Sequence, residues 1–117
     1  MARKISTEDG RAALAGVRSG DPERTDLATS VRYLLQLLGE KAPGHTVEVR
    51  VPPFGAVQII EGPRHTRGTP PNVVETDPMT WISLALGTQQ WQEAEASGRI
   101  LASGVRADIS DLLPLRP

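Results

Sequence analysis

Apolar residues recur at helical spacing in two segments near the start of the chain. In the first segment Ser6 precedes acidic residues, an arrangement that suits an N-cap and first turn, where the helix dipole favours negative charge. The apolar side of this segment is weak, because it consists only of Ala12, Ala13 and Val17. We therefore expect a short helix or an extension over residues 1–20.

The second segment has the stronger pattern of a core helix. Asp21 is placed to cap it and Pro22 to occupy its first helical position, where the missing N–H of proline costs nothing. Apolar residues then recur every three or four positions. They are Leu27, Val31, Leu34, Leu35 and Leu38. Gly39 follows them and is predicted to end the helix.

The spacing of apolar residues then changes from that of a helix to that of a strand. Val47, Val49 and Val51 alternate with Glu48 and Arg50. Because successive side chains of a strand point to opposite faces, this alternation predicts one buried and one wet face. We expect the three valines to face the same apolar layer as the second helix.

Two further strands are predicted after this one. Pro52 and Pro53 end the first strand, and the apolar run over residues 56–60 predicts a second strand that forms a hairpin with it. The segment NVVET over residues 72–76 predicts a third, short strand. Between them lies EGPRHTRGTPPN, whose prolines and glycines suit a long connection.

The C-terminal part returns to helical spacing. Asp77 and Pro78 repeat the cap signature, and Gly87 is placed to end the helix that follows. Thr88 is predicted to cap a further short helix, which Ser97 and Gly98 end. The segment RILAS over residues 99–103 then predicts a strand, and a last helix, capped by Asp108, is expected before Pro114.

This order of elements predicts an α+β domain. Two helices, three strands, two helices, a strand and a helix follow one another without internal repeat. Such segregation favours a mainly antiparallel sheet with helices packed on one face. We expect residues 21–117 to form a single domain, preceded by the extension or short helix over residues 1–20.

Composition excludes several functions. The chain has 117 residues and no cysteine, so disulfides, thiolate metal sites and thiol catalysis are excluded. Thirteen Lys and Arg stand against fourteen Asp and Glu, with the signs interspersed, so a nucleic-acid partner is not expected. The charged start lacks a signal peptide's apolar region, and no apolar run is long enough to span a bilayer. We expect a cytoplasmic protein.

The later elements resemble those of a known family. The run DPMTWISLALGTQQWQEAEASGRILASGVRADISDLLPL, preceded by VEVRVPPFGAVQIIEGPRHTRGTPPNVVETDP, is similar to the sterol carrier protein family, in particular its small single-domain bacterial members. The resemblance covers residues 21–115. It implies a sterol carrier-like fold, a lipid or fatty acyl ligand, and neither catalysis nor a cofactor.

Two groups of residues are candidates for ligand binding. An apolar set could line a pocket between the helices and the sheet, or could simply be core. It consists of Leu34, Leu38, Trp81, Leu84, Trp91 and Ile100. In the long connection, Arg64, His65 and Arg67 could hold a carboxylate or phosphate head group, or could belong to a solvated loop.

The residues favour binding over catalysis. The two histidines have no metal-ligand spacing, and the nucleotide-binding and nucleophile-elbow motifs are missing. The first hypothesis is therefore a module that holds a hydrophobic small molecule. The alternative is a non-catalytic interaction or accessory domain with a filled core, which meets a protein partner through a sheet edge or its Trp-bearing helices.

Overall fold

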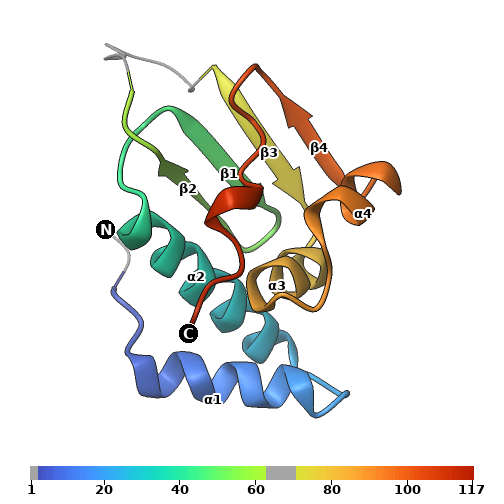
Figure 1. Cartoon of the computed structure of the whole chain (residues 1–117). Coiled ribbons are helices and arrows are strands. Elements are labelled where there is room, and N and C mark those ends of the chain that lie inside the picture. Colours follow the sequence, from blue (N-terminus) through green and yellow to red (C-terminus); the bar gives the residue numbers. More distant parts are fainter. Residues whose placement is uncertain (1–2, 63–70) are drawn as a thin grey trace.

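A computed structural model of the chain describes residues 3–62 and 71–117 (Figure 1). Its elements follow the predicted order. They are α1 (Thr7–Arg18), α2 (Arg24–Lys41), β1 (Val47–Val51), β2 (Gly55–Ile59), β3 (Asn72–Thr76), α3 (Pro78–Leu86), α4 (Trp91–Ala96), β4 (Ile100–Ser103) and the 3-10 turn η1 (Ser110–Leu112). The predicted α+β class is confirmed. The last helix is reduced to η1, three residues long, and Asp108 accepts a hydrogen bond from the N–H of Ser110 beside it.

The four strands form one mixed sheet in the order β2-β1-β3-β4. The hairpin of β1 and β2 is antiparallel, as predicted, and so is the pair of β3 and β4. The central pair of β1 and β3 is parallel, so that Val49 lies opposite Val57 on one side and Val74 on the other. The sheet is thus mainly antiparallel with a parallel pairing at its centre.

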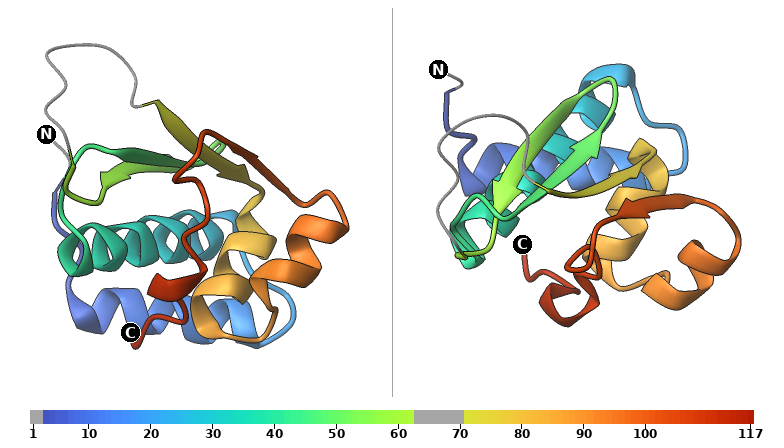
Figure 2. Two further views of the ribbon diagram at one scale, coloured as in Figure 1. Left: turned by 45° about the horizontal axis from the view of Figure 1, so that its top comes forward. Right: turned by 90° about the horizontal axis from the view of Figure 1, so that it is seen from above.

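The helices lie on one face of this sheet (Figure 2). Val47, Val49 and Val51 are fully buried on that face, in the same cluster as Leu34 and Leu38 of α2. Glu48 and Arg50 lie on the opposite face and form an ion pair with each other. The predicted orientation of β1 is confirmed, because a strand with one apolar face can bury only that face.

Helix α1 is a full element that packs on the side of α2 remote from the sheet (Figure 2). Ser6 caps it, since its Oγ accepts a hydrogen bond of 3.1 Å from the N–H of Asp9. Its most buried apolar residue is Leu14, at 1% exposure, and Gly10 brings its backbone against the ring of Tyr33 in α2. The weak apolar stripe is therefore supplemented by close backbone contact.

Some predicted helix ends are correct and others are wrong. Asp77 caps α3 by accepting a 3.0 Å hydrogen bond from the N–H of Thr80, and Gly87 ends that helix with a left-handed φ of 82°. Helix α2, however, begins at Arg24 rather than after Asp21 and continues through Gly39 to Lys41. Helix α4 begins at Trp91, with Gln90 rather than Thr88 as its N-cap.

The C-terminal segment folds back under the sheet. Ala107, Ile109 and Leu115 are buried in the core, and the N–H of Leu115 donates to the carbonyl oxygen of Ala85 in α3 at 2.7 Å. Lys41 donates to the carbonyl oxygen of Leu112 at 2.8 Å. The segment therefore closes the space between α2 and α3 with apolar side chains.

Candidate functional site

The six apolar residues predicted to line a pocket are all buried in one hydrophobic cluster. Each is at most 4% exposed: Leu34, Leu38, Trp81, Leu84, Trp91 and Ile100. Of these, Leu84 and Trp91 border a cavity of about 230 Å³. The set forms the centre of the core, and its contact with a ligand stays a prediction.

The two indole N–H groups differ in their surroundings. Trp81, at 1% exposure, donates its Nε1–H to the carbonyl oxygen of Val31 at 3.3 Å. The Nε1–H of Trp91 is buried and has no acceptor among the described residues. Neither tryptophan therefore lies at the rim of the core with its N–H in water.

The basic residues of the long connection lie outside the described residues. Arg64, His65 and Arg67 all fall within positions 63–70. Their binding of an acidic head group stays a prediction.

A groove of about 700 Å³ runs along the seam between α2 and β2. We call it the α2–β2 groove. Its larger apolar residues come from three parts of the chain: Ile5 before α1, Leu35 on α2, and Phe54 and Val57 at β2. Gly55, also in its wall, adds no side chain and so leaves the seam open.

The residues before α1 form one wall of this groove. Ile5 is held to α2 by two hydrogen bonds with Gln36: its N–H donates to Oε1 at 2.8 Å, and its carbonyl oxygen accepts from Nε2 at 2.9 Å. Lys4 pairs with Glu40 at 3.1 Å, in a contact exposed enough to contribute little stability. The backbone at Ile5 is thus fixed, whereas the charged side chains around it are free to adjust.

Cationic side chains outnumber anionic ones along the α2–β2 groove. Arg3, Lys4 and Arg32 line it, against the single carboxylate of Glu40. Arg32 is oriented by its Nε, which donates to the carbonyl oxygen of Phe54 at 2.8 Å. An apolar floor with a cationic rim suits an amphipathic anion.

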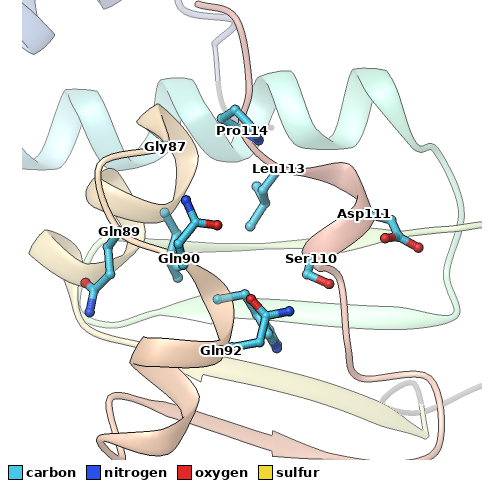
Figure 3. Close-up of a pocket in the computed structure, with 10 residues that line it drawn as sticks. Gly87, Gln89, Gln90, Gln92, Ser110, Asp111, Leu113 and Pro114 are labelled. Carbon is cyan, nitrogen blue, oxygen red and sulfur yellow. The ribbon is translucent and has the colours of Figure 1, made fainter.

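A second cavity, of about 230 Å³, lies between the start of α4 and the C-terminal segment. We call it the α4 pocket (Figure 3). Gln90, Gln92 and Ser110 contribute polar groups to it, and Leu84 and Leu113 contribute apolar ones. The pocket shares no lining residue with the α2–β2 groove.

The described part of the chain was also searched for metal-binding groups and membrane-spanning helices. Within residues 3–62 and 71–117, no group of three or more His, Asp or Glu side chains is arranged to hold a metal ion. Nor does any helix there combine the length and apolar character needed to cross a membrane.

Sequence reasoning missed the residues of the α2–β2 groove. Ile5 carried a signal, because an apolar residue just before an N-cap often packs against its surroundings. Phe54 carried another, since it is the only phenylalanine and stands in a turn after two prolines. It is 8% exposed, and the guanidinium of Arg24 lies 4.9 Å from its ring centroid.

Comparison with known proteins identifies a family. A family model described as "Bacterial SCP ortholog" matches residues 23–115. No curated protein matches the chain. The match spans α2 to the C-terminal segment and leaves out α1 and the residues before it.

Proposed function

This chain belongs to the bacterial sterol carrier protein (SCP) ortholog family, and we propose that it binds a single-chain anionic lipid, such as a fatty acid, in the α2–β2 groove. The observation that carries the proposal is the pairing of buried apolar side chains with exposed cationic ones in the lining of one groove. Its volume of about 700 Å³ lies within the range of small-molecule sites, about 300–1,000 Å³.

The space between the helices and the sheet is a less favourable location. Ile109 and Leu115 of the C-terminal segment, together with the predicted apolar set, fill it. Opening a void of about 300 Å³ there would cost about 7 kcal/mol at about 24 cal/mol per Å³. That is comparable with the whole stability of a small domain, about 5–15 kcal/mol. A groove that is already open carries no such cost.

The rim gives the site a preference for acids over alcohols. The Nε of Arg32 is engaged with a backbone carbonyl, which orients the guanidinium and leaves its terminal nitrogens for a carboxylate. Lys4 can exchange its exposed pairing with Glu40 for the same ligand, because an exposed ion pair is weak. The proposed role is binding without catalysis, and the predicted head-group role of Arg64, His65 and Arg67 is compatible with it.

Calorimetric titration with dodecanoate and with dodecanol tests this function. We expect dodecanoate to bind more tightly than dodecanol. Arg32→Gln should weaken the binding of dodecanoate but not of dodecanol, by about 1.5–3 kcal/mol, the range for a hydrogen bond to a charged group. Arg18→Gln is the matched control, since Arg18 is exposed in the last turn of α1 and does not line the groove. If neither lipid gives a saturable binding heat, the proposal is refuted. If Arg32→Gln weakens the binding of both lipids equally, the role of Arg32 is refuted.

The alternative function, an interaction domain, is favoured by one observation. Strand β4 is an edge strand, and Leu101 and Val105 are 65% and 100% exposed on it and just after it. An uncovered apolar edge is a template for pairing with another strand. Sedimentation of the wild type and of Leu101→Asp distinguishes this function: a dimer that the substitution dissociates supports it, and a monomer in both speaks against self-association.

A further inference from the structure

The side-chain amide of Gln36 holds the residues before α1 against α2 by two opposed hydrogen bonds. Its Oε1 accepts from the N–H of Ile5 at 2.8 Å, and its Nε2 donates to the carbonyl oxygen of the same residue at 2.9 Å. A primary amide carries an acceptor and donors side by side, so it can pair with both backbone groups of one residue. Gln36 therefore serves Ile5 as a neighbouring strand would.

The other contacts of this segment are weaker. An apolar residue just before an N-cap often packs on the fourth residue of its helix, but that position is Gly10, which has no side chain. The half-buried Ile5 side chain packs instead at the edge of the core. The ion pair of Lys4 with Glu40 is exposed at both ends and contributes little. The amide of Gln36 is thus the main polar link between this segment and α2.

The segment that Gln36 holds completes the lining of the α2–β2 groove. It contributes Arg3 and Lys4, two of the three cationic residues there, and the apolar side chain of Ile5. The remainder of the lining, including Arg32, comes from α2, the turn before β2, and β2 itself. The family model begins at residue 23, so one side of the groove lies within the matched domain and the other is added by residues that precede it.

We propose that Gln36 is a positioning residue, which docks residues 3–5 as a wall of the α2–β2 groove, and that the docking of this wall is coupled to the binding of the anionic lipid. The inference rests on the proposed lipid function. An undocked segment would take two cations and one apolar side chain away from the ligand, so the lipid binds the docked state more tightly. Because such coupling is reciprocal, a bound lipid stabilises the docked segment by the same factor.

Relaxation of the ¹⁵N-labelled full chain measures the docking without any ligand. Gln36→Met keeps the length of the side chain and the helix propensity, and removes both hydrogen bonds to Ile5. We expect the order parameter of the Ile5 amide to be about 0.85 in the wild type and below about 0.6 in Gln36→Met. Gln92→Met is the matched control, because Gln92 is exposed in α4 and does not line the groove. A rigid Ile5 amide in Gln36→Met would overturn the positioning role.

Calorimetry with dodecanoate and dodecanol then measures the coupling. Gln36→Met should weaken dodecanoate about fivefold or more, within the usual range of couplings between two sites, and weaken dodecanol less, because the cations leave with the wall. Saturating dodecanoate should also restore a rigid Ile5 amide in this variant, which a merely structural role of Gln36 would not produce. In the wild type, where no substitution is needed, dodecanoate should slow the exchange of the Ile5 N–H with water about fivefold or more.

The outcomes separate this inference from the proposed function. Dodecanoate that binds Gln36→Met as tightly as the wild type, although the Ile5 amide is mobile, would overturn the coupling and leave the proposed function standing. Exchange of the Ile5 N–H that is unchanged in wild type saturated with dodecanoate would do the same. If the wild type binds neither lipid, the proposed function fails and the coupling falls with it.

Discussion

Filling the α2–β2 groove with one side chain should separate ligand binding from stability. A Cβ added to Gly55 would lie 3.4 Å from Cδ1 of Leu35 and 3.7 Å from Cγ of Arg32, which are ordinary contacts. A Cβ therefore fits at this position, and we expect the two methyl groups of Gly55→Val to occupy part of the groove that Gly55 lines. Because glycine weakens a strand and the scale of β-propensity spans about 1 kcal/mol, the free energy of unfolding should stay level or rise by up to about 1 kcal/mol.

The loss of binding follows from the space that valine takes. Its two methyl groups replace about two methylenes of an acyl chain, each worth about 0.8 kcal/mol when buried, so dodecanoate should bind about 1.6 kcal/mol, or about fifteenfold, more weakly. Ala102→Val is the matched control. Ala102 is exposed in β4 at the other edge of the sheet and does not line the α2–β2 groove.

Urea unfolding and calorimetry on the same preparations measure both quantities. The expected pattern is unchanged or increased stability with weakened dodecanoate for Gly55→Val, and unchanged binding for Ala102→Val. Undiminished affinity in a well-folded Gly55→Val protein would show that the acyl chain lies elsewhere.

The remaining predictions concern stability. Leu38→Ala, at a position that is 0% exposed, should lower the free energy of unfolding by about 2–5 kcal/mol, and an unchanged urea midpoint would contradict its place in the core. Gly10→Ala should be destabilising, by about 1–3 kcal/mol of overpacking, because its Cβ would lie 2.5 Å from ring carbons of a buried tyrosine. The Cβ of Gly16→Ala would meet the carboxylate of Asp26, which can move aside, so helix propensity should raise the free energy of unfolding by up to about 1 kcal/mol. Equal effects of Gly10→Ala and Gly16→Ala on thermal unfolding would contradict the packing of α1 against α2. Partial burial raises the pKa of Asp77, but hydrogen bonds from the side chain and backbone of Thr80 outweigh it and lower the pKa below 3.8. The contribution of this carboxylate to the free energy of unfolding is thus present above pH 3.8 and lost as the pH falls through the lowered pKa. In urea unfolding, Asp77→Asn should therefore show a weaker loss of stability at acid pH than the wild type.

The start of α3 was predicted correctly from local sequence, because hydrogen bonds between neighbouring residues form the cap there. At α3 the carboxylate of Asp77 accepts from both the N–H and the hydroxyl of Thr80. Asp21 and Pro22 present the same dipeptide, but the corresponding third residue is Arg24, which has no hydroxyl. Helix α2 starts only at Arg24, so the dipeptide alone does not determine the boundary.

Tertiary contacts decided a boundary that local sequence predicted wrongly. Gly39 was expected to end α2, yet the helix continues to Lys41. A Cβ at Gly39 would lie 3.0 Å from Cγ2 of Val57, so this glycine allows close packing of α2 against β2. Glycine was needed here for contact between helix and sheet, and a pattern within one helix does not contain that information.

The core was readable from the sequence, whereas the α2–β2 groove was not. The core residues follow patterns between neighbours in the chain: Val47 and Val49 belong to a strand alternation, and Leu34 belongs to a helical stripe. All three side chains are buried as expected. The groove depends on the meeting of Ile5 and Phe54, which are far apart in sequence. It also includes residues before α2, which the sequence pattern assigned to an extension or short helix.

Photo-crosslinking locates the ligand most directly. A dodecanoate that carries a diazirine near its methyl end, irradiated with the full chain and followed by peptide mapping, reports which residues contact the acyl tail. We predict saturable labelling at Ile5, Leu35 or residues 54–57, removed by excess unlabelled dodecanoate. Labelling concentrated at Leu84 and Trp91, or labelling that dodecanoate does not displace, would contradict the assignment of the α2–β2 groove as the lipid site.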